Sequence, residues 1–180
     1  MFRSIKEKIG YWLLDNQAEK VKRNPAFINL EEAKNIAIIS NIDSIEKYKI
    51  ISNFIKWLRS KNKDVFVIAF VENEEFKSFF EKEKSILFFN KKNITWYGKP
   101  RNIKYQDFIE KEFDLLIDTS LHQFITFHYL VAMSKARLKV GKYCEKYAYY
   151  DFMIDVGNNN DFKFFIDQIK HYLCDLNKKS

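Results

Sequence analysis

Short runs of consecutive apolar residues recur along the chain, separated by stretches with helical spacing. A continuous run, in place of strict alternation, is typical of a strand that is covered on both faces. We therefore expect central strands of a mostly parallel sheet at Ile36–Ile39, Val65–Val71, Leu115–Ile117 and Phe152–Ile154. Charged or polar residues interrupt three weaker candidates, which we expect nearer an edge: Ile86–Phe89, Ile94–Tyr97 and Arg137–Val140.

Apolar residues at steps of three and four predict helices between these strands. The clearest covers residues 44–61, where Asp43 followed by Glu46 suggests a capping pair. Another covers residues 161–176, and a stretch at 124–133 is apolar almost all round, which predicts a buried helix. Strands alternating with such helices predict an α/β fold, a three-layer sandwich with a Rossmann-like sheet and right-handed connections, formed by residues 25–180 as one domain.

The segment before Pro25 precedes the first predicted strand and reads as a separate amphipathic helix within residues 1–24. Its basic residues are set apart from one apolar face, which consists of Phe2, Ile5, Ile9, Trp12 and Leu13. Such a helix can pack on its own domain or on a second copy, and it can also bind a partner or a membrane surface. All four interpretations stay open at this point.

Composition excludes several classes of protein. The 180 residues are 47% apolar and 31% charged, which fits a globular domain and excludes disorder. The four glycines lie too far apart for a dinucleotide fingerprint or a P-loop, so we expect no nucleotide cofactor. Cys144 and Cys174 lack zinc-site spacing, so we expect no metal. Because neither an export signal nor a membrane span is apparent, we expect a cytoplasmic location.

The net charge of +7, from 31 basic and 24 acidic residues, favours an anionic partner. Basic and aromatic residues are concentrated in two segments, a combination that RNA-binding proteins use for phosphates and for base stacking. The leading hypothesis is therefore a non-catalytic module for RNA or a ribonucleoprotein surface such as the ribosome. The alternative is solvated lysines beside core aromatics. The candidate RNA-binding residues are Lys91, Lys92, Trp96, Lys99, Arg101, Lys135, Arg137, Lys139 and Lys142.

A second hypothesis, from a different class, is a small enzyme or ligand-binding domain. Ligands of open α/β sheets bind beyond the carboxyl ends of strands, where the strand order reverses. If the strand ending at Asp118 lies beside the first strand, two polar loops meet there, with candidate ligand-binding residues Asp43, Asp118, Ser120 and His122. Except for His122, these are also residue types that cap helices, so capping alone explains them equally well.

Three stretches carry a resemblance to known families: Phe113–Ser120, Tyr129–Gly141 and Tyr150–Asp155. They resemble an uncharacterised bacterial family of short α/β proteins that carries only a domain-of-unknown-function label. The same order is similar, more faintly, to the N-terminal half-domain of heptosyltransferase-type glycosyltransferases. That analogy implies that Asp118 lies at an acceptor cleft and that Gly141 ends a sheet strand. No second Rossmann-like half follows, so we do not expect a complete glycosyltransferase.

Overall fold

The computed structural model describes residues 4–72, 86–101 and 103–176. Its sheet has six strands in the order β3-β2-β1-β4-β5-β6, and every neighbouring pair is parallel. The α/β fold with a parallel, Rossmann-like sheet is therefore confirmed. The strands are β1 (Asn35–Asn41), β2 (Asp64–Phe70), β3 (Ile86–Phe89), β4 (Leu115–Asp118), β5 (Leu138–Lys142) and β6 (Phe152–Ile154).

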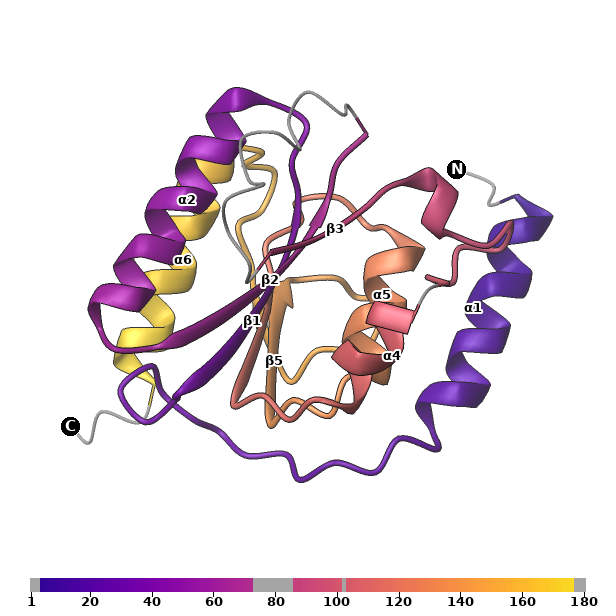
Figure 1. The fold of residues 1–180 in the computed structure, drawn as a ribbon, viewed down its shortest axis with the longest axis horizontal. Helices are drawn as coiled ribbons and strands as arrows, with labels where there is room; N and C mark the ends of the chain where they lie inside the picture. The colour runs from indigo at the N-terminus through magenta and orange to yellow at the C-terminus, as the bar shows by residue number, and fades with distance from the viewer. Residues whose placement is uncertain (1–3, 73–85, 102, 177–180) are drawn as a thin grey trace.

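Helices cover both faces of the sheet (Figure 1). One face carries α2 (Ile45–Ser60) and α6 (Phe162–Asp175), and the other carries α4 (Ile103–Glu110) and α5 (Ile125–Met133). The first helix, α1 (Ile5–Ala18), packs on the outer side of α5 (Figure 1). Seven consecutive residues of α5 are buried between the sheet and α1, as its all-round apolar sequence predicts.

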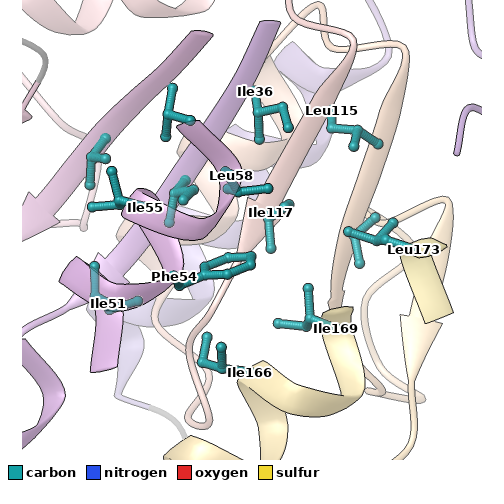
Figure 2. Packing of buried hydrophobic residues seen from close by; sticks show 14 of the residues in the cluster. Ile36, Ile51, Phe54, Ile55, Leu58, Leu115, Ile117, Ile166, Ile169 and Leu173 are labelled. Carbon is teal, nitrogen blue, oxygen red and sulfur yellow. The ribbon is translucent and has the colours of Figure 1, made fainter. Parts of the chain in front are cut away.

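The larger part of the core lies between the sheet and the α2–α6 pair. Phe54 and its apolar neighbours on α2 face Ile169 of α6, and both helices pack on the strand residues Ile36, Leu115 and Ile117 (Figure 2). These residues are almost fully buried. Strand and helix residues therefore form one closely packed cluster, which joins α2 and α6 to β1 and β4.

Two strand positions and one short element differ from the prediction. We expected Phe152–Ile154 to be central, but β6 is an edge strand, and β5, expected nearer an edge, is the second strand from that edge. The misleading signal was Lys139 in β5, whose charged side chain is buried. The predicted strand Ile94–Tyr97 is wrong: only Ile94 forms an isolated bridge, with Pro100, because hydrogen bonds between Thr95 and Lys99 close a turn.

The start of α2 also corrects a prediction, because Ser44 caps the helix in place of Asp43. The Ser44 hydroxyl accepts a hydrogen bond from the Lys47 backbone N–H at 3.2 Å. The Asp43 carboxylate instead lies 2.6 Å from the Lys47 ammonium, as an ion pair one helical turn apart at the surface.

This difference makes a testable prediction. We expect Ser44→Ala to lower the free energy of unfolding by about 1 kcal/mol, because a backbone N–H of the first turn loses its acceptor. Asp43→Ala serves as the matched control and should cost at most about 0.5 kcal/mol, since exposed ion pairs contribute little. Urea unfolding measures both values. A larger loss from Asp43→Ala than from Ser44→Ala would contradict this assignment.

Candidate functional site

The strand order reverses between β1 and β4, which lie side by side as the second hypothesis requires. At their carboxyl ends, Thr119 donates hydrogen bonds from both its backbone N–H and its hydroxyl to the Ile39 carbonyl, at 2.9 and 3.0 Å. The loops that follow β1 and β4 therefore open at the same edge of the sheet. This edge carries all four residues predicted for ligand binding.

Two of those four residues form a buried cluster with a residue that the sequence did not indicate. Asp118 is only 3% exposed, and one of its carboxylate oxygens accepts hydrogen bonds from the backbone N–H and the hydroxyl of Ser120, at 2.9 and 2.5 Å. The other oxygen accepts a hydrogen bond from the Tyr150 hydroxyl at 2.7 Å. We call Asp118, Ser120 and Tyr150 the Asp118 cluster. Burial raises the pKa of Asp118, although these donors act in the opposite direction.

Gly141 makes the Asp118 cluster possible. A Cβ atom added at this position in β5 would lie 2.4 Å from the Tyr150 ring, closer than any real contact. The ring can cross β5 at this point only because residue 141 has no side chain. A glycine inside a strand signals such a close approach, but the sequence alone does not name the residue that approaches.

The other two predicted residues do not join this cluster. The side chain of His122 is exposed, and Asp43 is exposed and paired with Lys47. The Asp118 carboxylate has three donors around it and almost no exposed surface, so it holds the loop after β4 in place. Asp118 and Ser120 thus hydrogen-bond to each other inside the protein, while Asp43 and His122 are exposed at the same edge.

The second basic segment does not form one surface. Lys135 and Arg137 precede β5 and lie at the amino-terminal edge of the sheet, whereas Lys142 ends β5 at the opposite edge. Lys139 is buried, so its side chain is not presented at the protein surface together with the other predicted RNA-binding residues. Of the neighbouring aromatic residues, Tyr147 and Tyr150 are also buried. The burial of Tyr147 and Tyr150 agrees with the core aromatics of the alternative interpretation, whereas the burial of Lys139 does not agree with its solvated lysines.

Lys139 is an unusual lysine because its side chain enters the core. Its ammonium donates a hydrogen bond to the Ala132 carbonyl at 3.2 Å. Arg23 and Asp151 lie nearby, and their side chains form a two-pronged ion pair. Burial, assisted by the charge of Arg23, lowers the pKa of Lys139 to about 7, and Asp151 only partly opposes this shift.

The first basic segment presents an exposed aromatic side chain on a well-ordered turn. η1 (Lys91–Asn93) follows β3, and the chain then reverses between Ile94 and Pro100. Trp96, at the tip, is 63% exposed. Exposed Lys91, Lys92 and Arg101 lie on either side of it in sequence. We call residues 91–101 the Trp96 turn.

The helix α1 docks on its own domain, but not through the face that its sequence suggests. Gly10, Tyr11 and Leu14 are buried, and the Tyr11 hydroxyl lies 2.8 Å from His128 Nδ1 of α5. Ile5 and Trp12, from the predicted apolar face, are 76% and 66% exposed. The close approach needs Gly10, where a Cβ would lie 2.1 Å from the Tyr97 carbonyl oxygen, and this glycine lies on the face that turns inward. Phe2 lies outside the described residues.

A metal site and a membrane-spanning helix each require a particular arrangement of the described residues. No three His, Cys, Asp and Glu side chains among them are grouped so that they could hold a metal ion. Cys144 and Cys174 are free thiols and half-buried. None of the described helices is long and apolar enough to cross a bilayer. Binding of α1 to a membrane surface or to a partner stays a prediction.

Comparison with known proteins supports the fold and the family. No curated protein matches the sequence. Among solved structures, E. coli heptosyltransferase WaaC with ADP has a TM-score of 0.51 at 9% identity, over 81% of this chain. The match spans 48% of that chain, about half its length, and shows a shared fold alone. The crystal structure of TarM has a TM-score of 0.42 at 16% identity, over 87% of this chain and 31% of its own, too weak to argue from.

The expected resemblances are thereby confirmed, one as a family and the other as a fold. The match to the family extends over residues 6–176 and so includes all six strands and all of α1 except its first residue, Ile5. The chain belongs to the family of unknown function DUF6913.

Proposed function

We propose that this protein is a non-catalytic binding module for single-stranded RNA, free or on a ribonucleoprotein surface such as the ribosome, with the Trp96 turn as its contact. The observation that carries the proposal is the exposed indole of Trp96 on a turn whose backbone is firmly held. Contact of the large indole side chain with water is unfavourable in free energy, and the flat face of the ring is well suited to stacking on a base. A cytoplasmic location accompanies this proposal.

Backbone hydrogen bonds close the Trp96 turn at several points. Thr95 N–H donates to the Lys99 carbonyl at 2.8 Å, and Gly98 N–H donates to the Thr95 carbonyl at 3.0 Å. Gly98 has a φ of 97°, which favours glycine. The Lys99 ammonium donates to the Gln17 side chain of α1 at 2.8 Å. A held turn loses little conformational entropy when a base stacks on Trp96, which favours binding.

Three exposed cations would supply the phosphate contacts. Lys91 is ion-paired with Glu72 at 2.7 Å, but both side chains are exposed, so the pair is weak and can exchange for a phosphate. Lys92 and Arg101 are also exposed. Lys99 contributes differently, because its ammonium is engaged by Gln17 and anchors the turn. The proposed contact is therefore one stacking surface with cations beside it.

The alternative is a site at the β1–β4 switch point. A small enzyme or a glycosyltransferase-like ligand-binding domain would need its polar groups to reach a ligand. Asp118 is buried and hydrogen-bonded on both oxygens, which leaves His122 and Asp43 as the accessible members. The likeness to a heptosyltransferase structure concerns the fold, and a fold does not carry an activity with it.

Binding of a labelled single-stranded RNA, measured by fluorescence anisotropy, tests the proposal. We expect Trp96→Ala to weaken binding by about tenfold or more, because stacking on an aromatic side chain contributes about 1–3 kcal/mol per base. Reversal of Lys91, Lys92 and Arg101 to Glu should abolish it, and in the unaltered protein the affinity should fall steeply with salt.

Trp12→Ala is the matched control, since Trp12 is equally exposed but lies on α1. This variant should bind RNA as the unaltered protein does. Equal losses in Trp12→Ala and Trp96→Ala, or no loss in either, would refute a specific role for the Trp96 turn.

A further inference from the structure

A polar cleft lies at the amino-terminal edge of the sheet, opposite the edge where open α/β sheets generally bind ligands. Its volume is about 510 Å³, which is large enough for a small molecule. The segment that links α1 to β1 forms one wall, and the loops that precede β4 and β5 form the other. Open α/β sheets do not in general have a ligand site at this edge, so the cleft depends on the particular residues of this protein.

Interactions between distant parts of the chain hold the walls in place. Ala26 N–H donates a hydrogen bond to the Arg137 carbonyl at 3.0 Å, which ties the linking segment to β5. Arg23 binds the Asp151 carboxylate with both of its terminal nitrogens, and it donates to the Ala136 carbonyl at 3.2 Å. The cleft is therefore preformed, which lowers the entropic cost of binding a ligand.

The charge in the cleft favours an anion. Its lining contains four basic side chains, Lys22, Arg23, Lys135 and Arg137, against two acidic ones, Glu112 and Asp114. Arg23 is already engaged by Asp151. The Arg137 guanidinium is 51% exposed and has one long contact, at 3.5 Å, with Asp114. Its remaining donors are suited to a two-pronged contact with a phosphate group.

Asp114 and Glu112 indicate that the ligand would carry hydrogen-bond donors in addition to its negative charge. Burial alone would raise the pKa of Asp114, but the Lys34 and Asn35 backbone N–H groups and Arg137 outweigh burial and hold that pKa below its usual range. An ionised carboxylate beside the basic residues would repel a purely anionic ligand. It would accept hydrogen bonds from hydroxyl groups, as the exposed Glu112 would.

A smaller and more apolar hollow adjoins the cleft and shares Arg137 with it. Its volume is about 230 Å³, and Pro25, Phe27 and Leu138 are part of its lining. The Phe27 side chain is exposed there. Arg137 thus lies between a polar compartment and an apolar one. A ligand with a phosphate at Arg137 could extend hydroxyls into the first and a planar ring toward the second.

We propose that this cleft binds a phosphate monoester of a hydroxyl-bearing small molecule, with Arg137 as the phosphate contact and Lys135 beside it. A sugar phosphate and a nucleoside monophosphate share this chemistry. The proposal is independent of RNA binding at the Trp96 turn, because the two sites lie at opposite edges of the sheet.

Isothermal titration of the full-length protein with ribose 5-phosphate, with uridine monophosphate and with inorganic phosphate tests the proposal. We expect saturable binding of the two esters, each at least about tenfold tighter than inorganic phosphate. Arg137→Gln and, separately, Lys135→Gln should each weaken ester binding, by about tenfold for Arg137. Lys92→Gln, in the Trp96 turn, is the control and should leave it unchanged. Phe27→Ala should weaken only the nucleotide if the planar ring lies on Phe27.

The controls separate this proposal from the preceding one. Arg137→Gln should retain RNA binding and the urea midpoint of the unaltered protein, which shows that the fold persists. Lys135 lies in an exposed loop, so its variant remains informative if Arg137→Gln is unstable. Absence of saturable ester binding at millimolar concentration would overturn the proposal. So would ester binding by both Arg137→Gln and Lys135→Gln that is as tight as in the unaltered protein.

Discussion

Gly141→Ala is expected to lower the free energy of unfolding by roughly 2–5 kcal/mol, an unusually large effect for one methyl group. The added Cβ would lie 2.4 and 2.6 Å from two carbon atoms of the buried Tyr150 ring, so the ring must move. Its movement breaks the 2.7 Å hydrogen bond from the Tyr150 hydroxyl to Asp118. Overpacking and loss of a donor to a buried carboxylate then act together. Urea unfolding followed by circular dichroism measures the loss.

Two further variants separate the steric part from the hydrogen bond. Tyr150→Phe keeps the ring and removes only the donor, so it should cost about 1–3 kcal/mol. Asp118→Asn removes the charge that burial disfavours, and it should reduce the cost of Tyr150→Phe in the double variant. Because the folded-state pKa of Asp118 is raised, this group favours folding at low pH and loses that contribution as pH rises through the folded pKa. Additive effects of the two substitutions would show that the bond is not important.

The second large effect concerns Lys139, whose pKa is about 7 in the folded protein and 10.5 ordinarily. Between these two values the unfolded chain keeps the proton that the folded protein has lost, so the unfolded state binds more protons and stability rises with pH. In Lys139→Met this contribution is absent. The free energy of unfolding of the unaltered protein, minus that of Lys139→Met, should therefore increase by about 1.4 kcal/mol per pH unit above pH 7.

Urea unfolding of both proteins at several pH values above 7 measures that slope. Other groups titrate in this range, but they are common to both proteins and cancel in the difference. Lys56→Met, a substitution at an exposed position of α2, is the control. Its free energy of unfolding should change with pH as that of the unaltered protein does. If the free energy of unfolding of Lys139→Met shows the same pH dependence as that of the unaltered protein, the side chain of Lys139 is not held in the core at neutral pH.

The central strands β1, β2 and β4 and the edge strand β3 could be predicted because a strand's apolar run reflects the burial of both its faces. The helices α2, α5 and α6 follow from their spacing for a similar reason. The positions of β5 and β6 could not be predicted. A lysine in a strand suggests an edge, but Lys139 is buried, and its ammonium donates a hydrogen bond to the Ala132 carbonyl near the end of α5.

By itself, the sequence determined the fold class and the exclusion of glycine-rich phosphate loops, because each depends on residues close together in the chain. The tertiary structure decided that β1 and β4, about 80 positions apart, lie side by side. The tertiary structure decided which polar side chains meet. Asp118 and Tyr150 are 32 positions apart, and Arg23 and Asp151 are 128 apart. The tertiary structure also exposes Ile5 and Trp12 of α1. It places Lys135 and Arg137 of the second basic segment at one edge of the sheet and Lys142 at the opposite edge. Such contacts depend on how distant segments pack, and no local pattern encodes them.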